Sequence, residues 1–113
     1  MQAWATFAKR SDSVIYASCV TLAEVTDGTA RDVGVRRAVK AVRLVDVSPE
    51  IGHRAGQLRS AAAGSRRNHR DLTVDAVVAA TALTLPTPVV VLTSDAEDLR
   101  LLLASHDVRI EAV

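Results

Sequence analysis

The stretch that decides the fold runs from Val89 to Leu99 and reads Val-Val-Val-Leu-Thr-Ser-Asp-Ala-Glu-Asp-Leu. Its first four residues are aliphatic, as expected of a strand that is buried on both faces of a parallel sheet. Three carboxylates then follow within four residues, at Asp95, Glu97 and Asp98. Because open α/β sheets bind their ligands beyond the carboxyl ends of their strands, this concentration of charge predicts a functional site at the strand end.

The composition is that of one aliphatic domain. The chain has 113 residues, of which 49% are hydrophobic and 3% aromatic, and we expect a single domain over residues 1–113. Its formal net charge of +1 includes a basic segment with Arg66, Arg67 and Arg70, which is typical of a solvated loop or of a contact with phosphates. The single cysteine, Cys19, excludes an internal disulfide. We expect no signal peptide and no membrane span, and hence a cytoplasmic protein.

Apolar spacing and turn residues divide the chain into alternating strands and helices. We expect strands over residues 14–17, 44–47, 89–92 and 108–113. We expect helices over residues 2–10, 21–28, 31–42, 48–64, 73–85 and 95–105. This alternation predicts an α/β fold with a mainly parallel sheet.

Two of the expected helices begin with recognisable capping residues. Thr21 and Glu24 have the spacing of a capping box, in which the two side chains bond each other's backbone N–H groups. Ser48 and Pro49 fit the N-cap and the first position of the next helix but one. We therefore expect helix starts at Thr21 and at Ser48.

Three acids, Glu24, Asp75 and Asp95, each lie near the start of an expected helix. Glu24 and Asp95 follow strands whose carboxyl ends would share one edge of the sheet, and the helix of Asp75 is expected to pack beside them. Carboxylates at close range repel each other unless a cation lies between them, and oxygen ligands select Mg²⁺ or Mn²⁺. We therefore predict a divalent metal site that activates water against a phosphodiester.

Each acid also has a purely structural interpretation. Glu24 could do no more than close its capping box, and Asp95, Glu97 and Asp98 could do no more than stabilise the start of their helix. Asp75 is harder to explain in this way, because a lone carboxylate in an apolar helix costs folding free energy unless it is paired. It is nevertheless close enough to its helix start to act as a cap.

The order of these motifs resembles the PIN-domain ribonucleases, and most closely the VapC-type toxins of bacterial toxin–antitoxin pairs, over almost the whole chain. The motifs are Leu22-Ala23-Glu24-Val25, Val74-Asp75-Ala76, and Leu92-Thr93-Ser94-Asp95 with Asp98-Leu99. The resemblance implies a three-layer α/β domain with strand order 3-2-1-4-5. It also implies an endoribonuclease that depends on Mg²⁺ or Mn²⁺ and acts on structured RNA, with a cognate antitoxin as partner and a homodimeric state.

The resemblance also assigns roles to individual residues. Glu24, Asp75 and Asp95 match the second, third and fourth acids of the family and are the expected catalytic residues and metal ligands. Asp98 matches a neighbouring acid and is a further candidate ligand. In the same scheme Arg66, Arg67 and Arg70 would bind the RNA backbone.

One part of the family pattern is absent from the sequence. The family begins with a strand of the type Leu-Asp-x-Ser/Gly-Ala-Leu, which supplies the first acid and forms the middle of the sheet. Here no residue matches that acid, and Asp71, one helical turn before Asp75, is a speculative substitute. Two explanations stay open: a longer working protein, or a truncated and inactive module that still binds an antitoxin or RNA. For the chain as given we expect weak metal binding and low or no cleavage.

A receiver-like or nucleotide-binding α/β domain is a weaker alternative. The five glycines form neither of the glycine-rich motifs that bind phosphate groups. A receiver domain also needs a late lysine, and the lysines here are Lys9 and Lys40. The sequence therefore favours the metal-dependent nuclease over this class.

Overall fold

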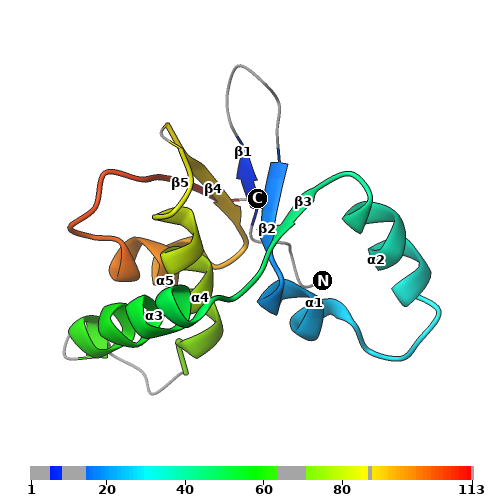
Figure 1. Ribbon diagram of the computed structural model, residues 1–113, viewed down its shortest axis with the longest axis horizontal. Coiled ribbons are helices and arrows are strands. Elements are labelled where there is room, and N and C mark those ends of the chain that lie inside the picture. The colour runs from blue at the N-terminus through cyan, green and yellow to red at the C-terminus, as the bar shows by residue number, and fades with distance from the viewer. Residues whose placement is uncertain (1–5, 9–14, 64–70, 87, 113) are drawn as a thin grey trace.

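The structure, a computed structural model, describes residues 6–8, 15–63, 71–86 and 88–112. Within these residues one five-stranded sheet has the order β3-β2-β1-β4-β5, and helices pack around it (Figure 1). The strands are β1 (Thr6–Ala8), β2 (Ile15–Ser18), β3 (Arg43–Val45), β4 (Val90–Thr93) and β5 (Arg109–Ala112). The helices are α1 (Val20–Val25), α2 (Asp32–Val39), α3 (Pro49–Ala62), α4 (Thr73–Ala82) and α5 (Ala96–Leu102).

The sheet is mainly parallel, as the sequence predicts. β2 pairs with β3 and β4 pairs with β5 in parallel, whereas β1 runs antiparallel to both of its neighbours, β2 and β4. Four strands therefore point in one direction, and their carboxyl ends share one edge of the sheet, called the carboxyl edge below. The predicted α/β class is confirmed. The strand order matches the order 3-2-1-4-5 that the resemblance implies for the family, but the central strand, which was expected to be missing from this chain, is present.

The central position of the sheet is occupied, and this corrects the expectation of a helix over residues 2–10. Residues 6–8 form β1, with Thr6 opposite Leu92 and Ala8 opposite Val90; the other residues of that range lie outside the described part. A vacant centre would leave the N–H and C=O groups of two inner strand edges without partners. Pairing on both sides of β1 removes that cost, and it outweighs the helical spacing of a few apolar residues.

The start of α3 is confirmed residue by residue. Ser48 is the N-cap, and its Oγ accepts a hydrogen bond from the backbone N–H of Ile51 at 3.1 Å. Pro49 occupies the first helical position, where a missing N–H costs nothing. A cap of this kind stabilises a helix by about 1 kcal/mol. This start fixes the register of the helix, and its apolar positions then face inward.

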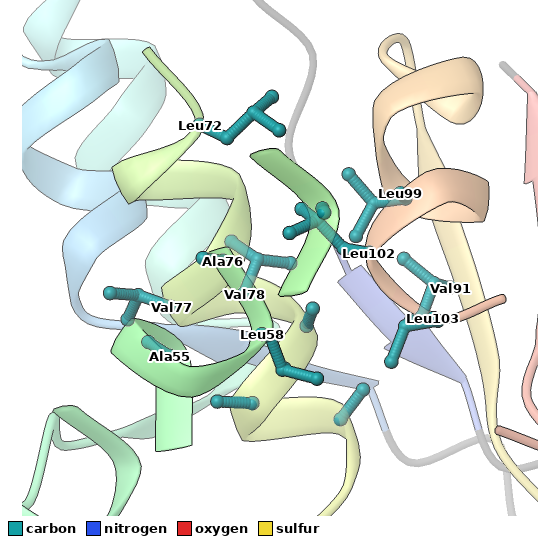
Figure 2. Packing of buried hydrophobic residues seen from close by; sticks show 14 of the residues in the cluster. Ala55, Leu58, Leu72, Ala76, Val77, Val78, Val91, Leu99, Leu102 and Leu103 are labelled. Carbon is teal, nitrogen blue, oxygen red and sulfur yellow. The ribbon is translucent and has the colours of Figure 1, made fainter. Parts of the chain in front are cut away.

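The main hydrophobic core lies around α4. Six of the ten residues of α4 are buried aliphatic side chains, and α3 and α5 pack against it. Figure 2 shows Ala55 and Leu58 of α3, Leu99 of α5 and Val91 of β4 in the same cluster as the α4 side chains. Alanines in α4 let the neighbouring helices approach closely. The buried residues of the described cluster are all aliphatic, and the half-buried Tyr16 packs against them.

α4 is also the element that bears on the question of a membrane span. Its ten residues extend for about 15 Å, which is half of the roughly 30 Å that a hydrocarbon core requires. Within the described residues, no helix is both long and apolar enough to cross a membrane. The apolar character of α4 is explained by its central place in the core.

Candidate functional site at the carboxyl edge

Two buried hydroxyl groups end the strands on either side of the sheet centre. Ser18 ends β2 and its Oγ accepts a hydrogen bond from the N–H of Val20 at 3.2 Å. Thr93 ends β4 and its Oγ1 accepts one from the N–H of Asp95 at 2.9 Å. Both side chains are buried, at 0% and 3% exposed. The same strand-to-helix turn is thus built twice, and it sets α1 and α5 at the carboxyl edge.

Asp95 stands at this edge, directly after β4. It is the N-cap residue of α5, yet its side chain makes no capping hydrogen bond to the helix. Its charge nevertheless lies at the start of α5, where the helix dipole favours an acid, so the interpretation of Asp95 as an acid that serves the helix dipole is not overturned. Glu97 and Asp98 lie in the first turn of α5, where negative charge is favourable, with Glu97 exposed and Asp98 half-buried.

Glu24 does not take part in the predicted capping box. α1 begins at Val20, with Cys19 as its N-cap and no side-chain capping bond, so Thr21 lies inside the helix and is buried. The expected start at Thr21 is wrong because the Ser18 hydroxyl already binds the N–H of Val20 and brings the helix start forward. Glu24 is exposed in the last turn of α1, where the helix dipole disfavours a carboxylate. The helix dipole of α1 therefore gives no reason for an acid there.

Asp75 lies half-buried in the first turn of α4. The start of this helix is held by other groups: Asp71 Oδ1 accepts hydrogen bonds from the Thr73 N–H at 3.0 Å and the Thr73 hydroxyl at 2.6 Å. Arg59 of α3 donates to the same hydroxyl at 2.7 Å. Asp71, the speculative substitute for the first family acid, thus has a structural role at the helix start.

The elements that carry these acids are in contact. α4 packs against both α1 and α5, and α1 also contacts β2, so Glu24, Asp75 and Asp95 belong to one connected part of the fold. Their carboxylates have the oxygen donors that Mg²⁺ and Mn²⁺ prefer. Among the described residues, however, no three His, Cys, Asp or Glu side chains are arranged to hold a metal ion. The metal site with its ligands Glu24, Asp75, Asp95 and Asp98 therefore stays a prediction, supported by donor chemistry more than by geometry.

A further acid at the carboxyl edge was not singled out from the sequence. Asp46 follows β3 directly, and its Oδ1 accepts a hydrogen bond from the Cys19 thiol at 3.5 Å. Burial, together with this bond and the charge of Asp46, raises the pKa of the Cys19 thiol above its ordinary value. The thiol is therefore protonated at neutral pH, as expected of an unreactive cysteine. Asp46 was not identified because the expected strand ran to residue 47 and therefore included it. A strand that ends at Val45 places Asp46 directly after the strand, and this position is the signal that could have identified it.

Three of the predicted site residues cannot be placed. Arg66, Arg67 and Arg70, the predicted RNA-binding residues, lie outside the described residues. Ser18 and Thr93 are site residues that the sequence reasoning missed. Their signal is a hydroxyl residue at the end of a strand, two positions before the first or capping residue of a helix.

Comparison with known proteins identifies a solved structure with a similar fold. No protein-family model matches the sequence, and no curated protein matches it. A solved structure, FitAB bound to the IR36 DNA fragment, is similar with a TM-score of 0.58 and 21% sequence identity, over 86% of this chain and 71% of that chain. FitAB is a toxin–antitoxin complex whose FitB subunit is a PIN-domain toxin. At this level of identity the likeness shows an α/β, PIN-like fold.

Proposed function

We propose that this PIN-like chain is a metal-dependent endoribonuclease, the toxin component of a type II toxin–antitoxin pair, which hydrolyses RNA phosphodiesters. The observation that carries the proposal is the placement of acids on contacting elements. Asp95 follows β4 at the carboxyl edge without capping its helix, and Glu24 and Asp75 lie on α1 and α4, which contact each other. The PIN-like fold agrees with this class of protein.

In this proposal Glu24, Asp75 and Asp95 hold one Mg²⁺ or Mn²⁺ ion, and Asp98 lies beside them as a further ligand. When bound, the ion lowers the pKa of a coordinated water and polarises the phosphodiester. The carboxylates supply the charge that retains the ion, and without it they repel both one another and the RNA backbone. The buried Ser18 and Thr93 hold the turns that carry the acids in place.

Arg66, Arg67 and Arg70 neutralise the RNA strand in this proposal, since cations that contact phosphates supply most of the affinity for nucleic acid. The protein partners are a cognate antitoxin and a second copy of the chain in a homodimer, and the site of action is the cytoplasm. The antitoxin rests on the likeness of the fold to FitAB, which is a toxin–antitoxin complex.

The first prediction concerns Asp95, and its test is cleavage of a labelled structured RNA in the presence of Mn²⁺. Asp95→Asn keeps the shape of the side chain but removes its charge. Loss of a group that only supports a metal ligand already costs about 10–100-fold, so for a proposed ligand we expect activity to fall by about 100-fold or more. The control is Asp107→Asn, which makes the same exchange at an exposed position in the loop between α5 and β5, at the opposite end of β4 from Asp95. Equal activity of wild type and Asp95→Asn would contradict the proposed function.

A second candidate function is a module that binds an antitoxin or RNA without cleaving it. Two observations favour it. The described residues contain no group of three side chains arranged for a metal ion, and β1 is reversed, so its carboxyl end lies at the edge opposite to Asp95. RNA association that survives EDTA, without cleavage products in Mn²⁺, would establish this candidate. Isothermal titration with Mn²⁺ separates the two, because micromolar stoichiometric binding favours the nuclease.

A further inference from the structure

α2 is the least buried of the helices in the described part of the chain. None of its residues is buried, and Figure 1 shows it apart from the group formed by α3, α4 and α5. With 3.6 residues per turn, Arg36, Arg37 and Lys40 project within an arc of about 100°, and all three side chains are exposed. These three residues are called the basic face of α2 below.

The acids near α2 are engaged in local contacts of the preceding loop. The Asp32 carboxylate accepts hydrogen bonds from the N–H groups of Asp27 and Gly28, at 3.0 and 2.9 Å. Asp27 accepts from both the N–H and the hydroxyl of Thr29 and pairs with Arg31 at 3.6 Å. The hydrogen bonds from Thr29 lower the pKa of Asp27, so this carboxylate is ionised at neutral pH. Both acids therefore shape the loop, and neither forms an ion pair with the basic face.

The stability of α2 explains the basic face only in part. No described residue forms an ion pair with Arg36, Arg37 or Lys40. The helix dipole favours cations in the last turn by about 0.3–1 kcal/mol each at low ionic strength. Arg36 and Lys40 are four residues apart, however, and like charges at that spacing cost about 0.2–0.5 kcal/mol. The dipole effect is the larger of the two, so the cations stabilise the last turn of this eight-residue helix slightly. The arc itself contains no acid of α2, so its positive charge is available to an external anion.

The residue types of the basic face indicate which class of partner it binds. A protein interface of standard size buries about 800 Å² on each side and has an apolar, often aromatic centre. The arc occupied by the basic face contains one apolar residue, Val33, which is 48% exposed. Among the described side chains the aromatic one is Tyr16, half-buried in β2. A face of this kind offers charges for phosphates and no ring for base stacking.

We infer that the basic face of α2 is a docking surface for the phosphate backbone of RNA. The inference rests on the proposed function, since it assigns to the RNA substrate a binding surface on α2, separate from the acidic carboxyl edge. Because the contacts are to phosphates, binding there is independent of base sequence and depends strongly on salt. Arg43, exposed at the start of β3, continues the same charge beyond the end of α2.

The test measures RNA binding in EDTA, where cleavage that needs a metal cannot occur. Fluorescence anisotropy of a labelled single-stranded RNA is recorded at increasing KCl for wild type and for the double variant Arg37→Ala and Lys40→Ala. Each phosphate contact on a single strand contributes about 0.7 to the slope of log K against log salt, so the variant should lose about 1.4. Alanine favours the helix, which keeps α2 folded. The control, Arg100→Ala with Arg109→Ala, removes the same charge from exposed positions on α5 and β5 and should leave the slope unchanged.

The outcomes separate the docking surface from the nuclease. Asp95→Asn protein that does not cleave RNA, but binds it with the same slope of log K against log salt as wild type, supports a docking surface separate from the carboxyl edge. This result holds whether or not the proposed nuclease activity is found. An unchanged slope in the α2 variant overturns the inference. So does an equal loss in the control variant, because net charge alone would then explain binding. Retained RNA binding with lost self-association in light scattering would identify the face as a protein interface, which also overturns it.

Discussion

At the scale of single residues, the site depends on hydroxyl groups at strand ends. Ser18 and Thr93 are buried at the ends of β2 and β4, and each bonds the N–H two positions further on. The effect of Thr93 is to fix the backbone of Asp95 while leaving the carboxylate out of helix capping. A buried side chain without charge thus determines where the acid stands.

The prediction at this scale is made for Thr93→Val, which keeps the shape and removes the acceptor. We expect a loss of about 1 kcal/mol in the free energy of unfolding, because the Asp95 N–H loses its partner. Urea denaturation of the purified chain measures the change. Thr81→Val is the matched control: Thr81 is equally buried, but its hydroxyl bonds the carbonyl of Val77 within α4, an interaction that stabilises a helix little. Equal losses in the two variants would show that the Thr93 bond has no special role.

At the scale of elements, the helices differ in how they are stabilised. α3 has a capped start and a buried face, and α4 is almost wholly buried. α2 has neither a side-chain cap nor a buried residue. An eight-residue helix whose apolar residues are at most half-buried is marginal in water, so α2 is expected to open more readily than the core.

The prediction for α2 uses two glycines with opposite requirements. Gly34 lies inside the helix with open space around its Cα, so Gly34→Ala should stabilise α2 by about 1 kcal/mol. Gly28 has a φ of 77°, in the region that disfavours side chains, so Gly28→Ala should destabilise the loop before α2 by about 1–2 kcal/mol. Amide hydrogen exchange within α2 measures both changes. Faster exchange in Gly34→Ala would mean that α2 is not helical in solution.

At the scale of the whole molecule, the sheet combines two parallel pairs around a reversed central strand. This arrangement gives a prediction for disulfide formation. Ala8 lies opposite Val90 in the register of β1 and β4, so Ala8→Cys with Val90→Cys, in a Cys19→Ser background, should form a disulfide on mild oxidation. Thr6→Cys with Val90→Cys is the control, because its Cα atoms lie two residues out of register and more than about 7 Å apart. A disulfide in the control alone would mean that β1 runs parallel.

Features that depend on contacts between neighbouring residues could be predicted from the sequence better than features that depend on distant contacts. Ser48 and Pro49 identify the start of α3 because a cap is a contact between neighbours in sequence. The same reasoning failed at Thr21, where Ser18, just before the expected helix, already bonds the N–H of Val20. It also failed for β1, whose partners are two other strands of the sheet, so no local spacing could reveal it. The acids at the carboxyl edge were predictable by kind and by element, but how their side chains are arranged depends on helix packing that a sequence pattern does not contain.

The reversed central strand also has a consequence for synthesis on the ribosome. β1 ends at Ala8, whereas its partner β4 begins only at Val90. During elongation the centre of the sheet therefore cannot close until β4 has left the exit tunnel. Before that moment β1 and β2 form a hairpin with one exposed side, a state on which a chaperone, or another nascent chain, could act first.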